Sequence, residues 1–228
     1  MEMLCLFMEK INYYKESLKI IESTSDSNKK RRILIHACCG PCSAWPLKFL
    51  LDNDFEVTIF FNNSNIYPSF EYERRLKELQ KFIATYSAER NTDIKVIVTP
   101  YDNDNYCKDL EPYKDESEGL TRCRLCYKKR MNEAYRYADE NGYDFFTTVM
   151  TISRQKNSQI INAIGKELES IYKNCRYFYS DFKKNDGINI GREMRNHFNM
   201  YQQDYCGCKY TFPKSKIYNN KIDKNKKV

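Results

Sequence analysis

The chain has 228 residues, of which 41% are hydrophobic and 30% are charged, and its formal net charge is +7. This balance is typical of a soluble globular protein with one main domain, and it excludes an intrinsically disordered chain. No stretch approaches the roughly 18 apolar residues of a membrane-spanning helix, and residues 1–10 lack the cationic start of a signal peptide. We therefore expect a cytoplasmic protein with no membrane partner. Its mild positive charge is compatible with a polyanionic partner such as RNA.

The chain is predicted to contain one catalytic domain between two appendages. Residues 1–30 are expected to form an amphipathic helical extension, because apolar residues recur there at alternating three- and four-residue steps: Leu4, Phe7, Ile11, Tyr14, Leu18 and Ile21. Residues 31–213 would form the α/β catalytic domain. Residues 214–228 contain six lysines and a single acid, Asp223, which predicts a solvated lysine-rich tail.

From residue 31 onward, short apolar runs alternate with amphipathic segments. The predicted strands cover residues 33–35, 55–61, 94–98, 145–150 and 175–179. Helices are predicted from about Ser43 (with Pro46 in the first turn), from Pro68, over 123–140, over the segment that contains Ile160, Ile161, Ile164, Leu168 and Ile171, and over 193–201. This alternation predicts an α/β fold, a mainly parallel sheet flanked by helices. Ligands of such sheets bind beyond the carboxyl ends of the strands.

The cysteines gather in motifs at those strand ends and helix starts. Ten cysteines in a reducing compartment indicate metal binding or redox chemistry rather than a disulfide framework. The sequence HACCGPC contains Cys38, Cys39 and Cys42, and RCRLC contains Cys123 and Cys126. Helix starts favour the thiolate form, and four thiolates from two such turns make a site for zinc or for an iron–sulfur cluster. An adjacent Cys-Cys pair is less usual for structural zinc.

The remaining cysteines carry weaker signals. Cys206 and Cys208 form a CGC turn, which suits a redox-active pair or an accessory metal contact, although chance proximity explains CxC equally well when it is taken alone. The isolated Cys5, Cys107 and Cys175 are expected to be small core-filling thiols.

Seven segments in one order resemble the QueH-type epoxyqueuosine reductases. They are HACCGPCS, FFNNSNIYPSFEYERR, GLTRCRLCYKKRM, TTVMTISRQKN, DFKK, Tyr201-Gln202-Gln203 and YCGC, and the likeness runs from about Ile33 to Thr211. The resemblance implies a cobalamin-independent reduction of epoxyqueuosine to queuosine at the wobble position of tRNAs with GUN anticodons. It also implies a fold resembling adenine nucleotide alpha hydrolase-like proteins, a [4Fe-4S] cluster, a second mononuclear metal, expected to be iron, and an external electron donor.

The resemblance assigns roles to the thiols. Cys38, Cys39, Cys123 and Cys126 would ligate the cluster. Cys42 would contact the second metal, at a position where some family members have Asp, so this site would be softer here. Cys206 and Cys208 would form a redox pair beside the site. Candidate pocket residues within the matched segments are Asn65, Arg74, Ser153 and Lys156, and candidate proton donors are His36 and Tyr205.

A basic cluster surrounds the second cysteine pair and is a candidate RNA-binding surface: Arg122, Arg124, Lys128, Lys129 and Arg130, with Lys183 and Lys184 as further candidates. The alternative is an ordinary solvated helix face.

Two other functions compete with a reductase. One is a zinc-stabilised RNA-binding protein without redox activity. The other is an ATP-dependent RNA-modifying enzyme, which is disfavoured because ACCGPCS stands where a Gly-rich phosphate loop would be needed. The sequence leaves the oligomeric state open.

Overall fold

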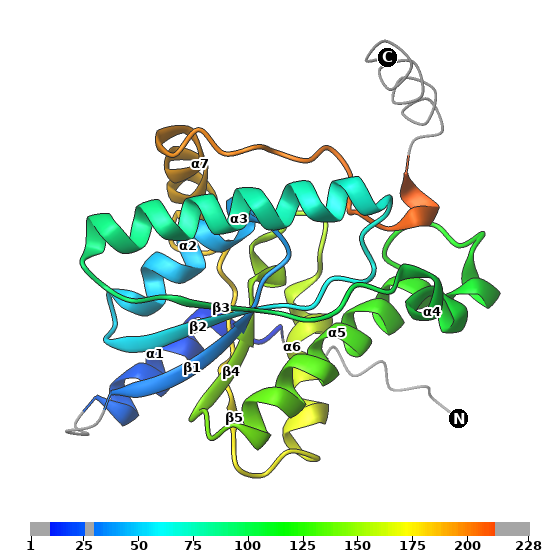
Figure 1. Ribbon diagram of the computed structural model, residues 1–228. Coiled ribbons are helices and arrows are strands. Elements are labelled where there is room, and N and C mark those ends of the chain that lie inside the picture. Colours follow the sequence, from blue (N-terminus) through cyan, green and yellow to red (C-terminus); the bar gives the residue numbers. More distant parts are fainter. Residues whose placement is uncertain (1–9, 26–29, 213–228) are drawn as a thin grey trace, which may run out of the picture.

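The computed structural model describes residues 10–25 and 30–212, and its centre is a five-stranded sheet (Figure 1). The strands are β1 (Arg31–His36), β2 (Phe55–Phe61), β3 (Lys95–Val98), β4 (Phe145–Thr148) and β5 (Arg176–Tyr177). Their order is β3-β2-β1-β4-β5, and every neighbouring pair is parallel. In this register Ile33 of β1 lies between Val57 and Phe145. The predicted α/β class is confirmed.

Helices cover both faces of the sheet. They are α1 (Tyr13–Thr24), α2 (Gly40–Leu51), α3 (Ser69–Arg90), α4 (Asn103–Cys107), α5 (Thr121–Glu140), α6 (Ser158–Glu169) and α7 (Gly187–His197). Short 3-10 turns occur at η1 (Lys108–Tyr113), η2 (Val149–Ile152) and η3 (Lys209–Thr211). Helices α2, α3 and α7 lie on one side of the sheet, and α5 and α6 lie on the other (Figure 1). Within the described ranges, none of these helices is both long enough and apolar enough to cross a membrane.

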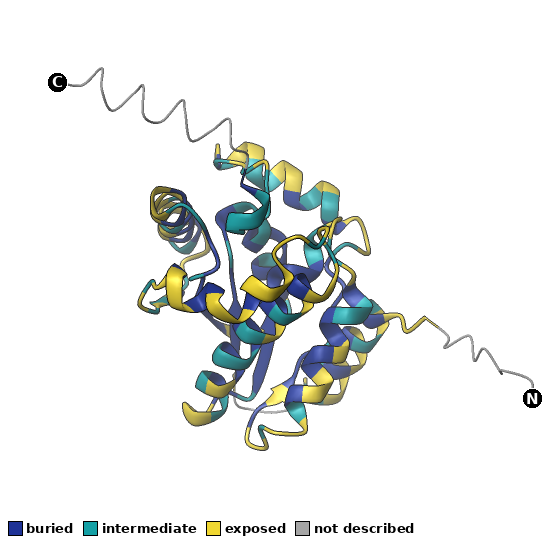
Figure 2. Cartoon of the chain, turned by 90° about the vertical axis from the view of Figure 1, so that its right-hand side faces the viewer, coloured by how far each residue is buried: buried dark blue, intermediate teal, exposed yellow. Residues whose placement is uncertain are grey.

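The two faces of the sheet bury two separate cores, because successive side chains of a strand point in opposite directions. Ile33 and Ile35 pack in the core beneath α2 and α3, whereas Leu34 packs in the core beneath α5 and α6. Figure 2 shows the buried strands enclosed by helices whose outer faces are exposed. The central strands therefore bury nearly every residue, and their apolar runs, such as Ile33–Ile35, are why they were visible in the sequence.

Helix α2 begins three residues earlier than predicted. Its first residue is Gly40, so Pro41 and not Pro46 lies in its first turn. Pro46 lies inside the helix, where it has no N–H to donate to the carbonyl of Cys42, four residues earlier. The early start places the CCxxC motif across the end of the preceding turn and the first turn of the helix.

Two further boundaries differ from prediction. The predicted strand 145–150 ends at Thr148, where the chain turns into η2 and the Thr148 hydroxyl accepts a hydrogen bond from the Met150 N–H at 3.2 Å. Helix α7 starts at Gly187 rather than near residue 193. A Cβ atom at Gly187 would lie 2.1 Å from the Phe182 carbonyl oxygen and 2.4 Å from Nε1 of Trp45, so only glycine allows this close approach.

The amino-terminal helix is shorter than predicted and turned about its axis. Leu4 and Phe7 of the predicted stripe lie outside the described residues. Ile11 precedes the helix and is 48% exposed, and Leu18 is 40% exposed. The buried positions of α1 are instead Tyr13, Ser17 and Ile20. Tyr13 fixes this rotation by stacking on Tyr179 at 5.7 Å between ring centroids. The tail 214–228 also lies outside the described residues, and the three-part division of the chain stays a prediction.

The strand order creates one topological switch point. From β1 the chain proceeds to β2 and β3 on one side, and it later returns to β4 and β5 on the other. Loops that leave β1 and β4 at their carboxyl ends therefore diverge to opposite faces and open a crevice, the usual ligand position in such sheets. The CCxxC motif follows β1, and residues 153–157 follow β4 and η2, so both meet at this crevice.

Candidate metal and thiol centre

Three thiols converge at the carboxyl end of β1. The ligand atoms of Cys38, Cys39 and Cys42 all lie within 4.8 Å of one another, and the Sγ atoms of Cys38 and Cys39 are 3.9 Å apart. Cys39 is buried, while Cys38 and Cys42 are partly exposed. The turn between β1 and α2 holds the first two thiols, and the first turn of α2 supplies the third. The structure thus brings together all three residues of the first predicted motif.

The triad favours a single thiolate at Cys38. A hydrogen bond from Cys39, and to a smaller extent one from Cys42, holds the pKa of Cys38 well below its usual value. The same contact with Cys38 raises the pKa of Cys39 to about 12, and the pKa of Cys42 rises for the same reason. A close cluster of one thiolate and two thiols is a set of soft donors that is already oriented for a metal.

Two cations stand beside the triad. Arg130 is buried, and Lys156 lines the cavity above the thiols. Burial opposes both charges, but electrostatic interactions with neighbouring sulfur atoms outweigh it and raise both pKa values: Cys126 contributes most for Arg130 and Cys206 for Lys156, with Cys38 contributing to each. Both cations therefore remain charged and interact with thiols from three separate segments of the chain.

The second predicted pair, Cys123 and Cys126, lies in the first turns of α5. Cys123 Sγ accepts a hydrogen bond from the Gly119 N–H at 3.2 Å, and the Tyr106 hydroxyl lies 3.3 Å from Cys126 Sγ. Both thiols are buried, and burial raises the pKa of Cys123. Neither thiol belongs to the close group around Cys38 in the part of the chain that the structure describes. The link between the two motifs is Arg130, whose charge interacts with Cys126 and Cys38.

Cys206 and Cys208 are free thiols on either side of Gly207, which has a φ of +105°. Main-chain contacts hold this turn, because the Tyr67 N–H donates to the Gly207 carbonyl at 2.7 Å and Cys208 forms an antiparallel bridge with Ile66. Burial raises the pKa of Cys208 to about 12. Cys206 interacts electrostatically with both Cys123 and Cys208, so the CGC turn lies beside the second cysteine pair.

A buried ion pair in α3 anchors the CGC turn. Arg75 Nε lies 2.7 Å from Glu71 Oε1, and both side chains are almost fully buried. The same guanidinium donates to the carbonyls of Tyr205 and Cys206 at 3.3 and 3.2 Å. Arg75 was not identified as a site residue from the sequence, although its spacing of four from Glu71 in a predicted helix was a usable signal.

Above the thiols lies a cavity of about 590 Å³, the thiol pocket. Its walls come from the β1–α2 turn, the loop after η2, helix α7 and the segment before the CGC turn. They include Cys38, Cys42, Arg75, Ser153, Arg154, Lys156, Arg192, Arg195, Gln202, Gln203 and Cys206. The contribution of α7 could not be predicted, because Arg192 and Arg195 resemble ordinary surface arginines in the sequence. Ser153 and Lys156 were predicted as pocket residues, and the structure places both in this wall.

Several buried polar atoms near the ends of β1 and β2 have unused hydrogen-bonding capacity. In the described ranges, His36 Nε2, Asn63 Oδ1, Asn65 Oδ1, Gln203 Oε1 and Arg130 Nε have no hydrogen-bond partner. Buried polar groups are normally paired, so such a concentration marks a place that suits a bound group. The amide of Gln203 already donates to Cys39 Sγ at 3.0 Å, as a hydrogen bond to a thiolate ligand would.

The basic cluster around the second cysteine pair is largely engaged inside the protein. Arg122 is 2% exposed, and its guanidinium donates to three main-chain carbonyls, including that of Glu116 at 2.6 Å. Lys128 and Lys129 pair with Glu167 and Asp109, each at 2.6 Å.

Arg130 is buried beside the thiols, and Arg124 is exposed. RNA binding by these five residues stays a prediction. Arg74, another predicted pocket residue, lies instead over the Tyr201 ring, 3.4 Å from its centroid.

Comparison with known proteins identifies the family. Residues 33–214 match the family described as "Epoxyqueuosine reductase QueH". A protein of that name from Staphylococcus epidermidis is 36% identical over 219 residues, covering 95% of this chain and 91% of the relative. Others of that name come from Staphylococcus aureus, 36% identical over 96% of this chain and 92% of the relative, and from Thermotoga maritima, 30% identical over 78% and 89%. The family match covers most of the chain, and three thiols converge where this fold binds ligands. The chain therefore belongs to the QueH family.

Proposed function

We propose that this protein reduces epoxyqueuosine to queuosine in tRNA, at a centre that holds a [4Fe-4S] cluster and a second metal ion, expected to be iron. The observation that supports this function best is the convergence of Cys38, Cys39 and Cys42 at the switch point of the sheet. Membership of a family whose relatives are named epoxyqueuosine reductases supplies the reaction class. The substrates would be tRNAs with GUN anticodons.

The donor set fits an iron–sulfur centre in its chemistry. Cys38, Cys39, Cys123 and Cys126 would hold the cluster, and Cys42 would contact the second metal. All five are thiols, the ligand type that iron–sulfur clusters take, and Gln203 and Arg130 offer hydrogen bonds and charge that stabilise ligating sulfur. When bound, these groups would supply single electrons and a Lewis acid for the epoxide oxygen.

The spacing of the first two thiols favours a second candidate as well. Two thiolates on one tetrahedral zinc ion with bonds of about 2.3 Å lie roughly 3.8 Å apart. The separation of 3.9 Å between Cys38 and Cys39 is close to that value. A zinc-stabilised RNA-binding protein without redox activity is therefore the alternative function, and metal analysis separates the two.

The residues of the chain can account for the protons and electrons of the reaction. Removal of the epoxide oxygen as water, with formation of the alkene, consumes two electrons and two protons. The thiols of Cys206 and Cys208 release the same two electrons and two protons when they join in a disulfide. An external reductant of unassigned identity would then restore both thiols. Cys206 lines the thiol pocket, so one thiol of this pair is at the cavity wall.

Other pocket residues would bind and orient the substrate. Lys156 and Arg154 lie in the loop after η2, and Arg192 lies on α7, so cations face the cavity from two sides. A charged ammonium at Lys156 would stabilise negative charge that develops on the departing oxygen. The nucleoside would enter from the open side of the thiol pocket.

Absorption spectroscopy with metal analysis tests this proposal. The protein, purified without oxygen, is expected to show a broad band near ~400 nm that dithionite bleaches, with about four or five irons and four sulfides per chain. Cys38→Ala should lose the band, whereas Cys175→Ala, which removes a buried thiol directly before the edge strand β5, should keep it. A colourless protein with one stoichiometric zinc, even after attempted cluster reconstitution, would rule out the reductase and favour the zinc alternative.

A further inference from the structure

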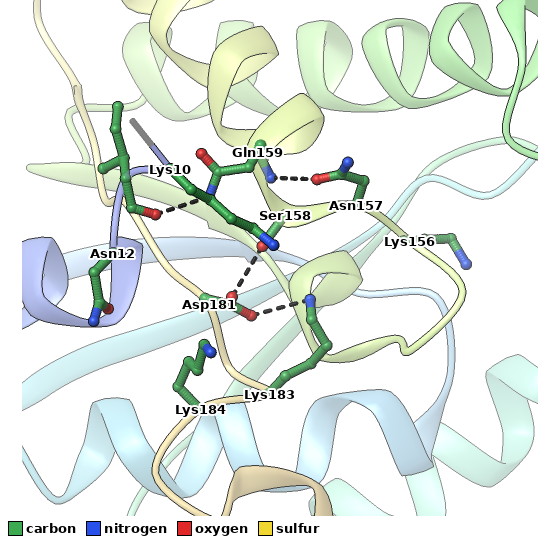
Figure 3. Close-up of a pocket in the computed structure, with 10 residues that line it drawn as sticks. Lys10, Asn12, Lys156, Asn157, Ser158, Gln159, Asp181, Lys183 and Lys184 are labelled. Carbon is green, nitrogen blue, oxygen red and sulfur yellow. Dashed lines mark hydrogen bonds and ion pairs between the residues drawn. The ribbon is translucent and has the colours of Figure 1, made fainter. Parts of the chain in front are cut away.

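A second polar cavity adjoins the thiol pocket and has no part in the chemistry above. This cavity, the lysine pocket, has a volume of about 500 Å³ (Figure 3). It is lined by Lys10, Ile11, Asn12, Lys156, Asn157, Ser158, Gln159, Asp181, Lys183 and Lys184. Lys156 lines both cavities, so the lysine pocket begins where the wall of the thiol pocket ends. Among the described residues that line it, Ile11 alone is apolar.

The acid in this pocket is already neutralised. Asp181 Oδ1 lies 3.0 Å from the ammonium of Lys183, and its Oδ2 accepts a hydrogen bond from the Ser158 hydroxyl at 2.9 Å (Figure 3). Lys183 also donates to the Thr151 carbonyl at 2.7 Å. Asp181 and Lys183 therefore cancel each other and act as a structural pair in the floor of the cavity.

Three other ammonium groups of this cavity have no carboxylate partner among the described residues. Among the described residues, no carboxylate forms an ion pair with Lys10, Lys156 or Lys184, in contrast to Lys128 and Lys129 of the α5 cluster. The Asn157 side chain already caps the amino terminus of α6, accepting from the Gln159 N–H at 2.8 Å. The positive charge of the cavity thus comes from its lysines and not from a free helix end.

The walls of the cavity are tied together across the sequence. The Gln159 side chain donates to the Ile11 carbonyl at 2.8 Å, which joins the segment before α1 to the start of α6 (Figure 3). Lys10 is held beside α6 through this contact, and Lys184 approaches from the segment after β5. Three segments distant in sequence therefore direct cations into one cavity next to the thiols.

We propose that the lysine pocket binds a backbone phosphate of the tRNA, next to the nucleotide whose base enters the thiol pocket. The proposal rests on the proposed function, because it assumes an RNA substrate in the thiol pocket. Phosphate contacts fix the register of a nucleic acid on a protein and carry no base specificity, so they suit lysines outside the reactive cavity. A strand whose target nucleotide is splayed into the thiol pocket carries its neighbouring phosphate past Lys156 towards Lys10 and Lys184.

Equilibrium binding of a labelled anticodon stem-loop RNA with a GUN anticodon tests the assignment at several salt concentrations. The logarithm of the binding constant falls as the logarithm of the salt concentration rises. Each lost contact with a single-strand phosphate should make this slope less steep by about 0.7. We expect a change of this size for Lys184→Gln and for Lys10→Gln. The ratio of wild-type affinity to variant affinity should therefore fall about fivefold for each tenfold rise in salt concentration. Lys166→Gln, with the same charge change at the far end of α6, should leave the slope unchanged.

Binding is measured without turnover, so the result does not depend on reductase activity. A Lys184-dependent slope in a protein that reduces nothing would support the lysine pocket and count against the proposed function alone. In an active protein, Lys184→Gln should raise KM for the tRNA and leave kcat unchanged. Slopes for Lys10→Gln and Lys184→Gln equal to those of the wild type and of Lys166→Gln would overturn the proposal.

Discussion

The guanidinium of Arg75 donates to the main-chain carbonyl of Cys206 at 3.2 Å, so a residue in the second turn of α3 holds the CGC turn beside this helix. Arg75 is itself held by its ion pair with Glu71 at 2.7 Å. The position of the two CGC thiols therefore depends on a buried charge pair more than 130 residues away in sequence.

Arg75→Met should destabilise the protein by about 3–5 kcal/mol, because the buried Glu71 carboxylate loses its cationic partner and keeps the hydrogen bonds from the Tyr201 hydroxyl. Urea unfolding followed by circular dichroism measures the loss. Arg74→Met removes the neighbouring exposed arginine, which only stacks on Tyr201, and should cost no more than about 1 kcal/mol. Equal losses in the two variants would contradict the anchoring role of Arg75.

Gly207→Ala should impair the CGC turn specifically. The residue has a φ of +105°, and a Cβ there would lie 2.9 Å from Nη1 of Arg75 and 3.3 Å from Cγ1 of Ile66. We expect about 1–3 kcal/mol of backbone strain together with slower reduction of the substrate. Gly142→Ala shares a positive φ of 68° but lies in an exposed turn, where the nearest atom outside its own segment is Arg32 Nη1 at 3.8 Å. The Gly142→Ala variant should lose stability and keep its rate of substrate reduction. A normal rate of reduction in Gly207→Ala would argue against a role for the CGC turn.

Cys42→Ala should separate the second metal from the cluster. Under the proposed ligand assignment, the variant keeps about four irons and four sulfides and loses the additional metal ion, which iron and sulfide analysis detects directly. The visible band should persist, in contrast to Cys38→Ala. Loss of all iron in Cys42→Ala would mean that this thiol belongs to the cluster itself.

Cys175 should be inert, in agreement with its predicted core-filling role. Burial first, and then the charges of Asp139 and Asp144, raise the pKa of this thiol. A raised pKa keeps the thiol protonated above the pH at which free cysteine ionises, and the thiolate is the reactive form. Iodoacetamide at pH 9 should leave Cys175 unlabelled in the native protein and label it in urea, as mass spectrometry of peptides would show. Rapid labelling of the native protein would contradict this environment.

The strands of this protein were predictable because their burial demands local patterns. β2 occupies the predicted residues 55–61, since a strand covered on both faces buries most of its residues, and here only Glu56 is exposed. Helix starts were less predictable, as at α2, where Gly40 and Pro41 tolerate a helical turn that the sequence alone did not require. The rotation of α1 depends on Tyr179, 166 residues away, so no local periodicity could reveal it.

The first cysteine motif of the site was visible in the sequence, whereas the partners of most basic residues were not. Cysteine spacing is a local signal, and Cys38, Cys39 and Cys42 lie together, but among the described residues Cys123 and Cys126 lie outside this close group, so the four-thiol ligand set stays a prediction. Whether a basic side chain is exposed or engaged inside the protein depends on its partners in the fold. Arg122, for example, donates to the main-chain carbonyls of Tyr113, Lys114 and Glu116. Lys156 is the exception, because its matched segment predicted it as a pocket residue, whereas Arg192 and Arg195 face the thiol pocket through the early start of α7, which only the fold reveals.

The most direct test of the central claim is reduction of tRNA that carries epoxyqueuosine. The protein is reconstituted with iron and sulfide in the absence of oxygen and supplied with dithionite. The tRNA is then digested, and its nucleosides are separated and identified by mass spectrometry. Our account predicts that epoxyqueuosine is replaced by a nucleoside lighter by one oxygen atom, queuosine, and that Cys38→Ala abolishes the conversion. Unchanged epoxyqueuosine after incubation with a protein that demonstrably contains its cluster would contradict it.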